Sequence, residues 1–301
     1  MSGPVRDGRN REIDLNGPVH YVAFGGRPGT TVVLVHGLGG SHLNWELIAP
    51  LLTPFATVLA IDLPGFGLSE PGHRNATVPA NTGVLERFVR EVAGEPVVLV
   101  GNSMGGMISI LLAERAPELV RGLVLVDPAM PPQVRRPRQL ATASLLTPML
   151  VPGVGEQVMR ARRNRVGARA IVNGTLRLCG MDPAQVPPDL LDRSVALVAN
   201  HRDVAGMDRA FLTAIRSLAW VLAQSGRYWR AMAALRIPVL LVHGDRDRLV
   251  PVAAAREAAR RNPSWRYVEL AGVGHVPQLQ IPVALAAHIL GWMRTEVEAA
   301  G

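Results

Sequence analysis

A serine between glycines, placed where an apolar segment meets a helical one, constrains this chain more than any other feature. Residues 95–100 (EPVVLV) are apolar and β-branched, which predicts a buried strand. Residues 107–115 (MISILLAER) predict a helix that Pro117 ends. Between them stands GNSMGG (101–106), where the glycines permit a turn too tight for side chains. Such a turn lifts the Ser103 hydroxyl out of the fold at the positive end of the helix, which predicts a nucleophile elbow.

Strand-like and helix-like segments alternate on both sides of this turn. The expected strands cover 19–24, 31–35, 57–61, 95–100, 122–126, 238–243 and 265–270. The expected helices cover 45–52, 81–93, 107–115, 252–261 and 283–297. The strand at 19–24 is expected at the edge of the sheet, whereas the continuous apolar strands indicate burial on both faces. This alternation predicts an α/β fold with an open, mostly parallel sheet flanked by helices.

The alternation stops between residues 131 and 236. No strand pattern appears there, and the sequence is rich in arginine, leucine, methionine and alanine with several prolines. The segment is too long for a loop. We therefore expect an inserted helical lid (cap) at 131–236 and an α/β core made of residues 1–130 and 237–301.

The positive charge of the chain is concentrated in the expected lid. The net charge is +8, and every basic residue is an arginine, because the chain contains no lysine. Residues 131–236 hold sixteen arginines and six acidic residues, a local balance of +10. No aromatic interleaving or nucleic-acid-binding motif accompanies them, so we expect no nucleic acid partner. We expect a small-molecule partner, with weak association of the basic lid with an anionic membrane surface as a further expectation.

Several classes of protein are excluded by what the sequence lacks. With Cys179 as its one cysteine, the chain has no internal disulfide and no multi-cysteine metal site, and we expect Cys179 to be a small buried hydrophobe. No metal-binding or phosphate-binding loop is present, so no cofactor or metal is expected. Residues 1–7 are polar, and no apolar run is long enough to cross a bilayer, which favours a cytoplasmic protein. Nothing in the sequence predicts the oligomeric state.

A serine nucleophile needs a base that takes its proton and an acid that orients the base. In an open α/β sheet these groups lie beyond the carboxyl ends of the strands. The expected strand 238–243 runs into GDRDRLVP, which holds Asp245 and Asp247. The expected strand 265–270 is followed by AGVGHVP, which holds His275. Serine, aspartate and histidine thus follow one another in the order that a nucleophile elbow implies.

Five stretches of the chain together resemble the signature motifs of the α/β-hydrolase superfamily. They are HGLGGS (36–41), DLPGFGLS (62–69), GNSMGG (101–106), GDRD with VP (244–251) and GH (274–275). The resemblance covers nearly the whole chain apart from the expected lid. It implies the α/β-hydrolase fold, with Ser103 as nucleophile, His275 as general base and later general acid, and Asp247 as the acid that orients His275.

The resemblance also implies an oxyanion hole made by the backbone N–H groups of Leu38 and Met104. Two alternatives to Asp247 stay open at this point. Asp245 could be the acid or a turn residue that bonds its own backbone. Asp127 stands at the end of the preceding strand, where some relatives keep the acid. The histidines at 36 and 243 are expected to be structural hydrogen-bonding groups.

The histidine loop GHVPQLQ is similar to that of small lidded carboxylesterases and monoacylglycerol lipases, which usually carry glutamate where this chain has Gln280. This implies a serine hydrolase, lipase-like, that cleaves a small or medium acyl ester through an acyl-enzyme. Apolar side chains of the expected lid would suit an acyl chain or simply pack its helices. They are Leu145, Leu146, Met149, Leu150 and Met159.

Two alternatives to an esterase remain. GNSMGG and a basic lid are also similar to carbon–carbon hydrolases of the meta-cleavage type. Those enzymes tend to carry tryptophan just after the histidine and a glycine–proline-rich oxyanion loop, where this chain has Val276 and Gly39-Gly40-Ser41. A non-hydrolytic ligand-binding relative is the second alternative, because such proteins can keep a complete triad. Epoxide hydrolases and dehalogenases use a carboxylate nucleophile, and Ser103 argues against both.

Overall fold

An eight-stranded sheet forms the centre of the computed structural model, which describes residues 8–131 and 147–297. The strands are β1 (Arg9–Asp14), β2 (Pro18–Gly26), β3 (Thr31–Val35), β4 (Thr57–Ile61), β5 (Val97–Asn102), β6 (Val120–Val126), β7 (Val239–Gly244) and β8 (Arg266–Leu270). Their order is β1-β2-β4-β3-β5-β6-β7-β8, with β2 antiparallel to β1 and β4 and all other neighbours parallel. The predicted open, mostly parallel sheet is confirmed.

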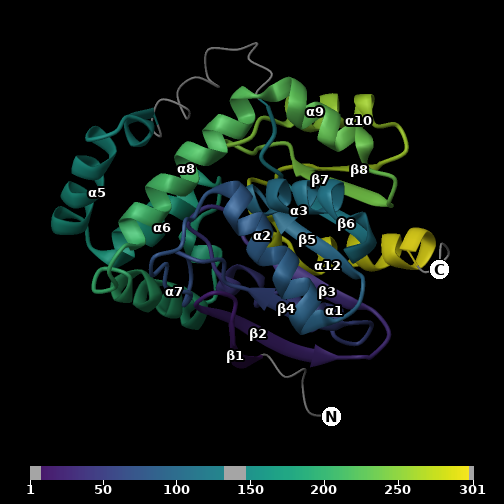
Figure 1. The fold of residues 1–301 in the computed structure, drawn as a ribbon, viewed down its shortest axis with the longest axis horizontal. Helices are drawn as coiled ribbons and strands as arrows, with labels where there is room; N and C mark the ends of the chain where they lie inside the picture. The colour runs from purple at the N-terminus through teal and green to yellow at the C-terminus, as the bar shows by residue number, and fades with distance from the viewer. Residues whose placement is uncertain (1–7, 132–146, 298–301) are drawn as a thin grey trace.

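Helices cover both faces of the sheet, which explains why its central strands are apolar throughout (Figure 1). The helices of the core are α1 (Ala49–Leu52), α2 (Val78–Phe88), α3 (Met104–Arg115), α10 (Val252–Arg261), α11 (Pro277–Gln280) and α12 (Pro282–Trp292). Leu99 of β5 packs in one buried cluster with Ile108 of α3. Its neighbour Val98 belongs to the cluster on the opposite face, with Trp292 of α12. Successive side chains of one strand thus fill two separate cores.

The N-terminal edge of the sheet differs from the prediction. The strand expected at the edge, β2, has β1 outside it, paired in antiparallel register from Arg9 opposite Ala23 to Asp14 opposite Pro18. The sequence of β1, RNREID, is polar and almost entirely exposed, so it carries no apolar alternation that could predict a strand. An exposed polar strand of this kind is suited to a sheet edge, where charged side chains discourage further pairing.

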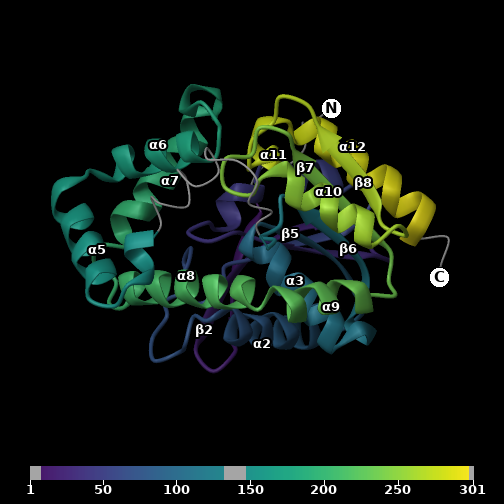
Figure 2. The same cartoon turned by 90° about the horizontal axis from the view of Figure 1, so that it is seen from above.

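The chain between β6 and β7 forms a helical insertion, residues 147–236, without a strand in that described range. It contains α5 (Val154–Arg165), α6 (Ala168–Leu178), the 3-10 turn η4 (Pro183–Gln185), α7 (Pro188–Asn200), α8 (Met207–Ala223) and α9 (Ser225–Ala234). Figures 1 and 2 show α5 to α8 grouped at one end of the sheet. Leu145 and Leu146 lie outside the described residues. No helix in the described ranges is long and apolar enough to span a membrane.

The insertion rests on the loops that follow the parallel strands. A Cβ on Gly65, after β4, would lie 2.4 Å from the side chain of Ala210 in α8. His201, just after α7, is hydrogen-bonded through Nε2 to the carbonyl oxygen of Gly67 at 2.6 Å. Any group presented at the carboxyl ends of these strands therefore lies between the core and the insertion.

Candidate active site

Ser103 stands on a strained turn between β5 and α3. Its φ of 55° and ψ of −118° are unusual for a residue with a side chain, and such geometry costs about 1–3 kcal/mol. The flanking glycines are required, because a Cβ on Gly101 would lie 2.6 Å from the carbonyl oxygen of Gly105. A Cβ on Gly105 would lie 2.2 Å from the carbonyl oxygen of Val35 in β3. The turn is the one that the sequence predicts, and Ser103 is only partly buried at its tip.

Asp247 and His275 are brought together from the loops after β7 and β8. The Nδ1 of His275 lies 2.6 Å from Oδ2 of Asp247, and both residues are buried. The other carboxylate oxygen of Asp247 accepts the backbone N–H groups of Leu249 at 2.7 Å and Val250 at 2.9 Å. Burial pushes the pKa of Asp247 upward, but the His275 charge and hydrogen bond outweigh it and lower that pKa. Asp247 is therefore an anion that orients the ring of His275.

The two other candidate acids are placed differently. Asp245 is exposed, and its Oδ1 accepts the backbone N–H of Gly272 at 2.7 Å, so it ties two loops together as a turn aspartate does. Asp127 is fully buried at the end of β6, where Oδ1 accepts the N–H of Gly244 at 2.9 Å. Burial, followed by the charge of neighbouring Asp247, raises the pKa of Asp127 well above its usual range. Asp127 therefore keeps its proton to a higher pH than an ordinary aspartate does.

The amide of Asn102 joins the nucleophile turn to the histidine loop. Its Nδ2 donates to the carbonyl oxygen of Val126 at 3.0 Å and to that of His275 at 3.1 Å. Within the described residues, the Ser103 hydroxyl and the His275 ring make no hydrogen bond to each other. Bonds of this kind are often long without substrate and tighten when it binds.

Two backbone N–H groups next to Ser103 lack partners in the described structure. Met104 is the first residue of α3, so its N–H has no acceptor within the helix. Leu38 belongs to the loop after β3, and its N–H donates to no backbone group in the described ranges. That loop lies against the nucleophile turn, because a Cβ on Gly37 would be 3.0 Å from Cβ of Ser103. The two donors are the pair that the sequence analysis expects for an oxyanion hole.

Two other histidines, His36 and His243, support the loops around the site. His36 makes a 2.7 Å contact through Nδ1 with the carbonyl oxygen of Gly37, and its Nε2 accepts the N–H of Leu63 at 3.0 Å. Burial lowers the pKa of His36, so the ring is neutral and can accept this bond. His243 donates from Nε2 to the carbonyl oxygen of Val250 at 2.9 Å, and burial lowers its pKa as well. Both contacts agree with the structural role expected for these residues.

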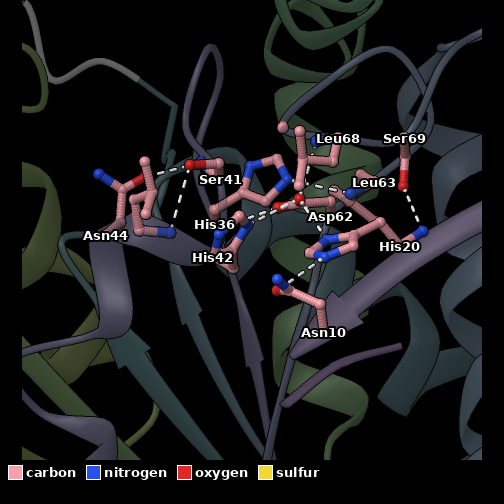
Figure 3. A network of polar contacts seen from close by, with 12 residues as sticks. Asn10, His20, His36, Ser41, His42, Asn44, Asp62, Leu63, Leu68 and Ser69 are labelled. Atoms are coloured by element: carbon pink, nitrogen blue, oxygen red, sulfur yellow. Dashed lines mark hydrogen bonds and ion pairs between the residues drawn. The ribbon is translucent and has the colours of Figure 1, made fainter. Parts of the chain in front are cut away.

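A network centred on Asp62 shapes the loop after β4 (Figure 3). Nδ1 of His20 and Nδ1 of His42 each lie 2.8 Å from Oδ2 of Asp62, and the N–H of Leu68 donates to the same oxygen at 2.9 Å. Burial alone would raise the pKa of Asp62, yet the two histidine hydrogen bonds hold it far below its usual range. The three converging side chains have the donor types of a metal site, but their hydrogen bonds to one another satisfy the carboxylate without one.

An apolar wall of the insertion faces the loop after β3, which is the expected oxyanion loop and is called so below. Met149 forms a buried cluster with two residues of α8, Leu212 and Ile215. Leu38, Phe211, Val158 and Met159 pack against it. A Cβ on Gly39 would lie 3.3 Å from the ring of Phe211, so α8 reaches the oxyanion loop directly. Of the side chains expected to suit an acyl chain, Met149 and Met159 belong to this group, whereas Leu150 is exposed.

Sequence reasoning misses two contacts of the histidine loop. The His275 N–H donates to the carbonyl oxygen of Cys179 in the insertion at 2.7 Å. Gln280 accepts the N–H of Gly274 through Oε1 at 2.8 Å. The only signal in the sequence was that Gln280 departs from the glutamate of the relatives. Cys179 itself is buried as expected, and burial raises the pKa of its thiol to about 12, so it is not a nucleophile.

Comparison with known proteins identifies the family and its breadth. The family described as alpha/beta hydrolase fold matches residues 30–282. An esterase of Mycobacterium tuberculosis is 29% identical over 294 residues, which cover 93% of this chain and 87% of the esterase. A 2-hydroxy-6-oxo-6-(2'-aminophenyl)hexa-2,4-dienoic acid hydrolase of Metapseudomonas resinovorans is 25% identical over 276 residues, with 88% and 84% of the two chains covered.

Two further similarities show how widely the same core is used. The dihydrolipoyllysine-residue acetyltransferase component of an acetoin cleaving system from Pseudomonas putida is 25% identical over 278 residues. The match covers 92% of this chain, which spans only 66% of that relative's length. The crystal structure of a haloalkane dehalogenase from Bradyrhizobium elkani superposes with a TM-score of 0.80 at 25% identity, over 98% of this chain and 100% of the other.

Proposed function

The chain belongs to the α/β-hydrolase family, and from this premise we propose that it is a serine hydrolase that cleaves a small or medium acyl ester through an acyl-enzyme. One observation carries the proposal. Ser103 is held on a strained turn beside a buried Asp247–His275 pair whose atoms lie 2.6 Å apart. A serine at the turn also separates this chain from dehalogenase chemistry, which needs a carboxylate nucleophile there.

In the proposed reaction the Ser103 hydroxyl attacks the ester carbonyl while Nε2 of His275 takes its proton. Nε2 is free for this because Nδ1 of His275 is bonded to Asp247. The backbone N–H groups of Leu38 and Met104 donate hydrogen bonds to the carbonyl oxygen and stabilise the negative charge that develops on it. His275 then protonates the leaving alcohol. Water attacks the acyl-enzyme with His275 again as base, which releases the acid and restores Ser103.

We further propose that residues 131–236 act as a lid over a core made of 1–130 and 237–301. The described part of this segment contacts the loops after β3, β4 and β8. The acyl chain would lie along the apolar wall made by Met149, Phe211 and Leu38, next to the oxyanion loop. Apolar side chains at this place favour a small-molecule ester with an apolar acyl group.

The test is hydrolysis of p-nitrophenyl butyrate by the Ser103→Ala variant. We expect kcat to fall by about 10⁴-fold or more, because only the oxyanion donors and binding would remain. Ser109→Ala is the matched control, since Ser109 lies in α3 and its hydroxyl bonds the carbonyl oxygen of Gly105 at 2.8 Å. It should keep its activity and its circular dichroism spectrum. Unchanged turnover in Ser103→Ala would contradict the assignment. A fluorophosphonate probe that fails to label Ser103 would favour a ligand-binding relative instead.

A carbon–carbon hydrolase of the meta-cleavage type is the second candidate, and one observation favours it. Arg162, partly buried on α5, has no ion pair or side-chain hydrogen bond within 4 Å among the described residues, and burial lowers the pKa of its guanidinium against the opposing charge of Asp208. Met159 lies one helical turn away in the apolar wall, so Arg162 could meet an anionic substrate. A dienoate substrate assayed beside the ester decides the question, since turnover of the dienoate alone would replace the esterase proposal.

A further inference from the structure

The histidine loop is held by backbone that belongs to the helical insertion. Between α6 and η4 the chain makes a turn at residues 179–181, and the carbonyl oxygen of Cys179 accepts the N–H of His275 at 2.7 Å. A Cβ on Gly274 would lie only 2.3 Å from that same oxygen. The two backbones are thus in direct contact beside the proposed base.

Gln280 completes this contact from the core side. It ends α11, five residues after His275, and its Oε1 accepts the N–H of Gly274 at 2.8 Å. Its Nε2 donates to the carbonyl oxygen of Gly180 at 3.5 Å. A carboxamide supplies both an acceptor and a donor, whereas the glutamate expected here from the resemblance could only accept. The side chain found in this protein is thus the one that can bridge the histidine loop and the insertion.

The end of α6 and the turn that follows it also reach the loop of Asp247, where a Cβ on Gly180 would lie 3.5 Å from the carbonyl oxygen of Arg246. The guanidinium of Arg248, next to Asp247, donates to the carbonyl oxygen of Arg177 at the end of α6 at 3.4 Å. Leu249 packs with the buried cluster that contains Cys179 and Val276. This part of the insertion therefore contacts the chain next to Asp247 and the chain next to His275.

We propose that Gln280 and the turn at residues 179–181 form a latch through which the insertion positions His275. Gln280 is a positioning residue in this arrangement, because its amide holds the backbone on both sides of the contact while the His275 ring does the chemistry. The proposal rests on the proposed serine hydrolase function. One consequence is that the insertion cannot lift at this turn without releasing the backbone of His275, so the base is in place only when the latch is closed.

The test compares Gln280→Met, Gln280→Glu and Gln157→Glu in the full chain. Gln280→Met removes both hydrogen bonds, and we expect kcat for p-nitrophenyl butyrate to fall about ten- to hundredfold with KM within about twofold. Gln280→Glu keeps an acceptor for Gly274 and adds a negative charge near His275. The acid limb of its kcat/KM profile should move to higher pH, because that charge favours the protonated ring. Gln157→Glu adds the same charge on an exposed face of α5 and should shift nothing.

Two measurements separate loss of the latch from loss of folding and from failure of the proposed function. Thermal unfolding shows whether Gln280→Met still folds. NMR signals of the His275 ring, recorded without substrate, show whether its surroundings have changed. The latch is supported if kcat falls and the ring signals move in a folded variant. It is overturned if kcat stays within twofold and the signals are unchanged, or if only KM changes. Failure of the wild type to hydrolyse any ester would overturn the proposed function, while the ring signals would still test the latch.

Discussion

At the residue scale, the site holds two buried aspartates whose pKa values are shifted in opposite directions. Asp247 is ionised because His275 and two backbone N–H groups bond it. The protonated form of Asp127 is favoured because the side chain is fully buried beside that charge, and its Oδ2 has no hydrogen-bond donor that would stabilise an ionised form. Two carboxylates in one site cannot both ionise without a large cost. Their roles should therefore separate sharply on substitution by asparagine.

Replacing each aspartate by asparagine tests this difference. Asp127→Asn substitutes one neutral group for another and keeps an acceptor for the N–H of Gly244, so kcat/KM for the ester should stay within about threefold. Asp247→Asn removes the charge that orients His275, and kcat should fall by about 10⁴-fold. The measurement is steady-state hydrolysis of p-nitrophenyl butyrate by both variants. Equal losses in the two variants would mean that Asp127 shares the role of the acid.

Because the pKa of Asp127 is raised in the folded state, the free energy of unfolding should depend on pH differently in the wild type and in Asp127→Asn. Because burial and Asp247 raise the pKa in the folded state, folding favours the protonated acid. Its contribution is complete below the ordinary carboxyl value of about 3.9 and is lost as pH rises toward the folded value. The asparagine at this position in the variant cannot titrate. The free energy of unfolding from urea titrations, taken as variant minus wild type, should therefore rise between pH 4 and pH 8. A constant difference over that range would contradict the assigned charge state.

Motifs predicted the positions of Ser103, Asp247 and His275 because their chemistry requires particular residue types at strand ends. The same reasoning left Asp245, Asp127 and Asp247 as competing acids. Only the three-dimensional arrangement separates them, since the distance between an acid and His275 depends on how two loops meet. The contact of His275 with Cys179 involves backbone atoms, which leave no trace in the side-chain sequence. That contact could not have been predicted.

At the element scale, the loop after β4 is wrapped around one carboxylate. Asp62 accepts bonds from His20 of β2, from His42 at the start of the 3-10 turn after β3 and from Leu68 of its own loop, and it is fully buried (Figure 3). The loop must therefore pass very close to Asp62. At Gly67 a Cβ would lie 2.1 Å from the carboxyl carbon of Asp62, and the φ there is +56°. The loop in turn supports α8, because Gly65 touches Ala210.

A pair of glycines in this region separates backbone strain from crowding. Gly67 and Gly72 have φ values of +56° and +53°, but a Cβ on Gly72 would meet nothing within 4 Å. Gly72→Ala should cost about 1 kcal/mol of unfolding free energy from strain alone. Gly67→Ala should cost about 1–3 kcal/mol more, because the methyl group overlaps Asp62. Urea unfolding measures both. If the two losses are equal, the Asp62 contact does not constrain the loop.

Strands with continuous apolar sequences were predictable, whereas the division of a short helical segment was not. Central strands such as β5 and β7 have continuous apolar sequences and lie where expected. The helix expected at 45–52 is instead the 3-10 turn η1 (His42–Trp45) followed by α1. Ser41 caps the first piece, and Pro50 stands in the first turn of the second. The cap at Ser41 and the position of Pro50 thus divide into two short elements a segment that apolar periodicity alone predicts as one helix.

At the scale of the whole molecule, charge and exposed apolar surface meet on the insertion. Four of its large apolar side chains are exposed, and Trp220 of α8 is the most exposed of them at 67%. The others are Leu150, Val151 and Val154. Arg216 joins these segments, since it bonds the carbonyl oxygens of Met149 and Val151 one helical turn before Trp220. The same insertion carries exposed arginines on α5, and exposed apolar and basic side chains together are typical of contact with an anionic lipid surface.

Binding to vesicles that contain phosphatidylglycerol tests this proposed association. Co-sedimentation of the wild type should be clear at low ionic strength and lost at about 0.5 M salt, where charges are screened within a few ångströms. Reversing the charge of Arg160 and Arg165, which make no ion pair among the described residues, should weaken it about tenfold or more. Arg260→Glu is the matched control, because Arg260 lies on α10 of the core and pairs with Glu257. Equal weakening by this control would assign the binding to net charge. Absence of binding at low salt would contradict the association. It would favour the alternative in which arginines of the insertion meet an anionic substrate.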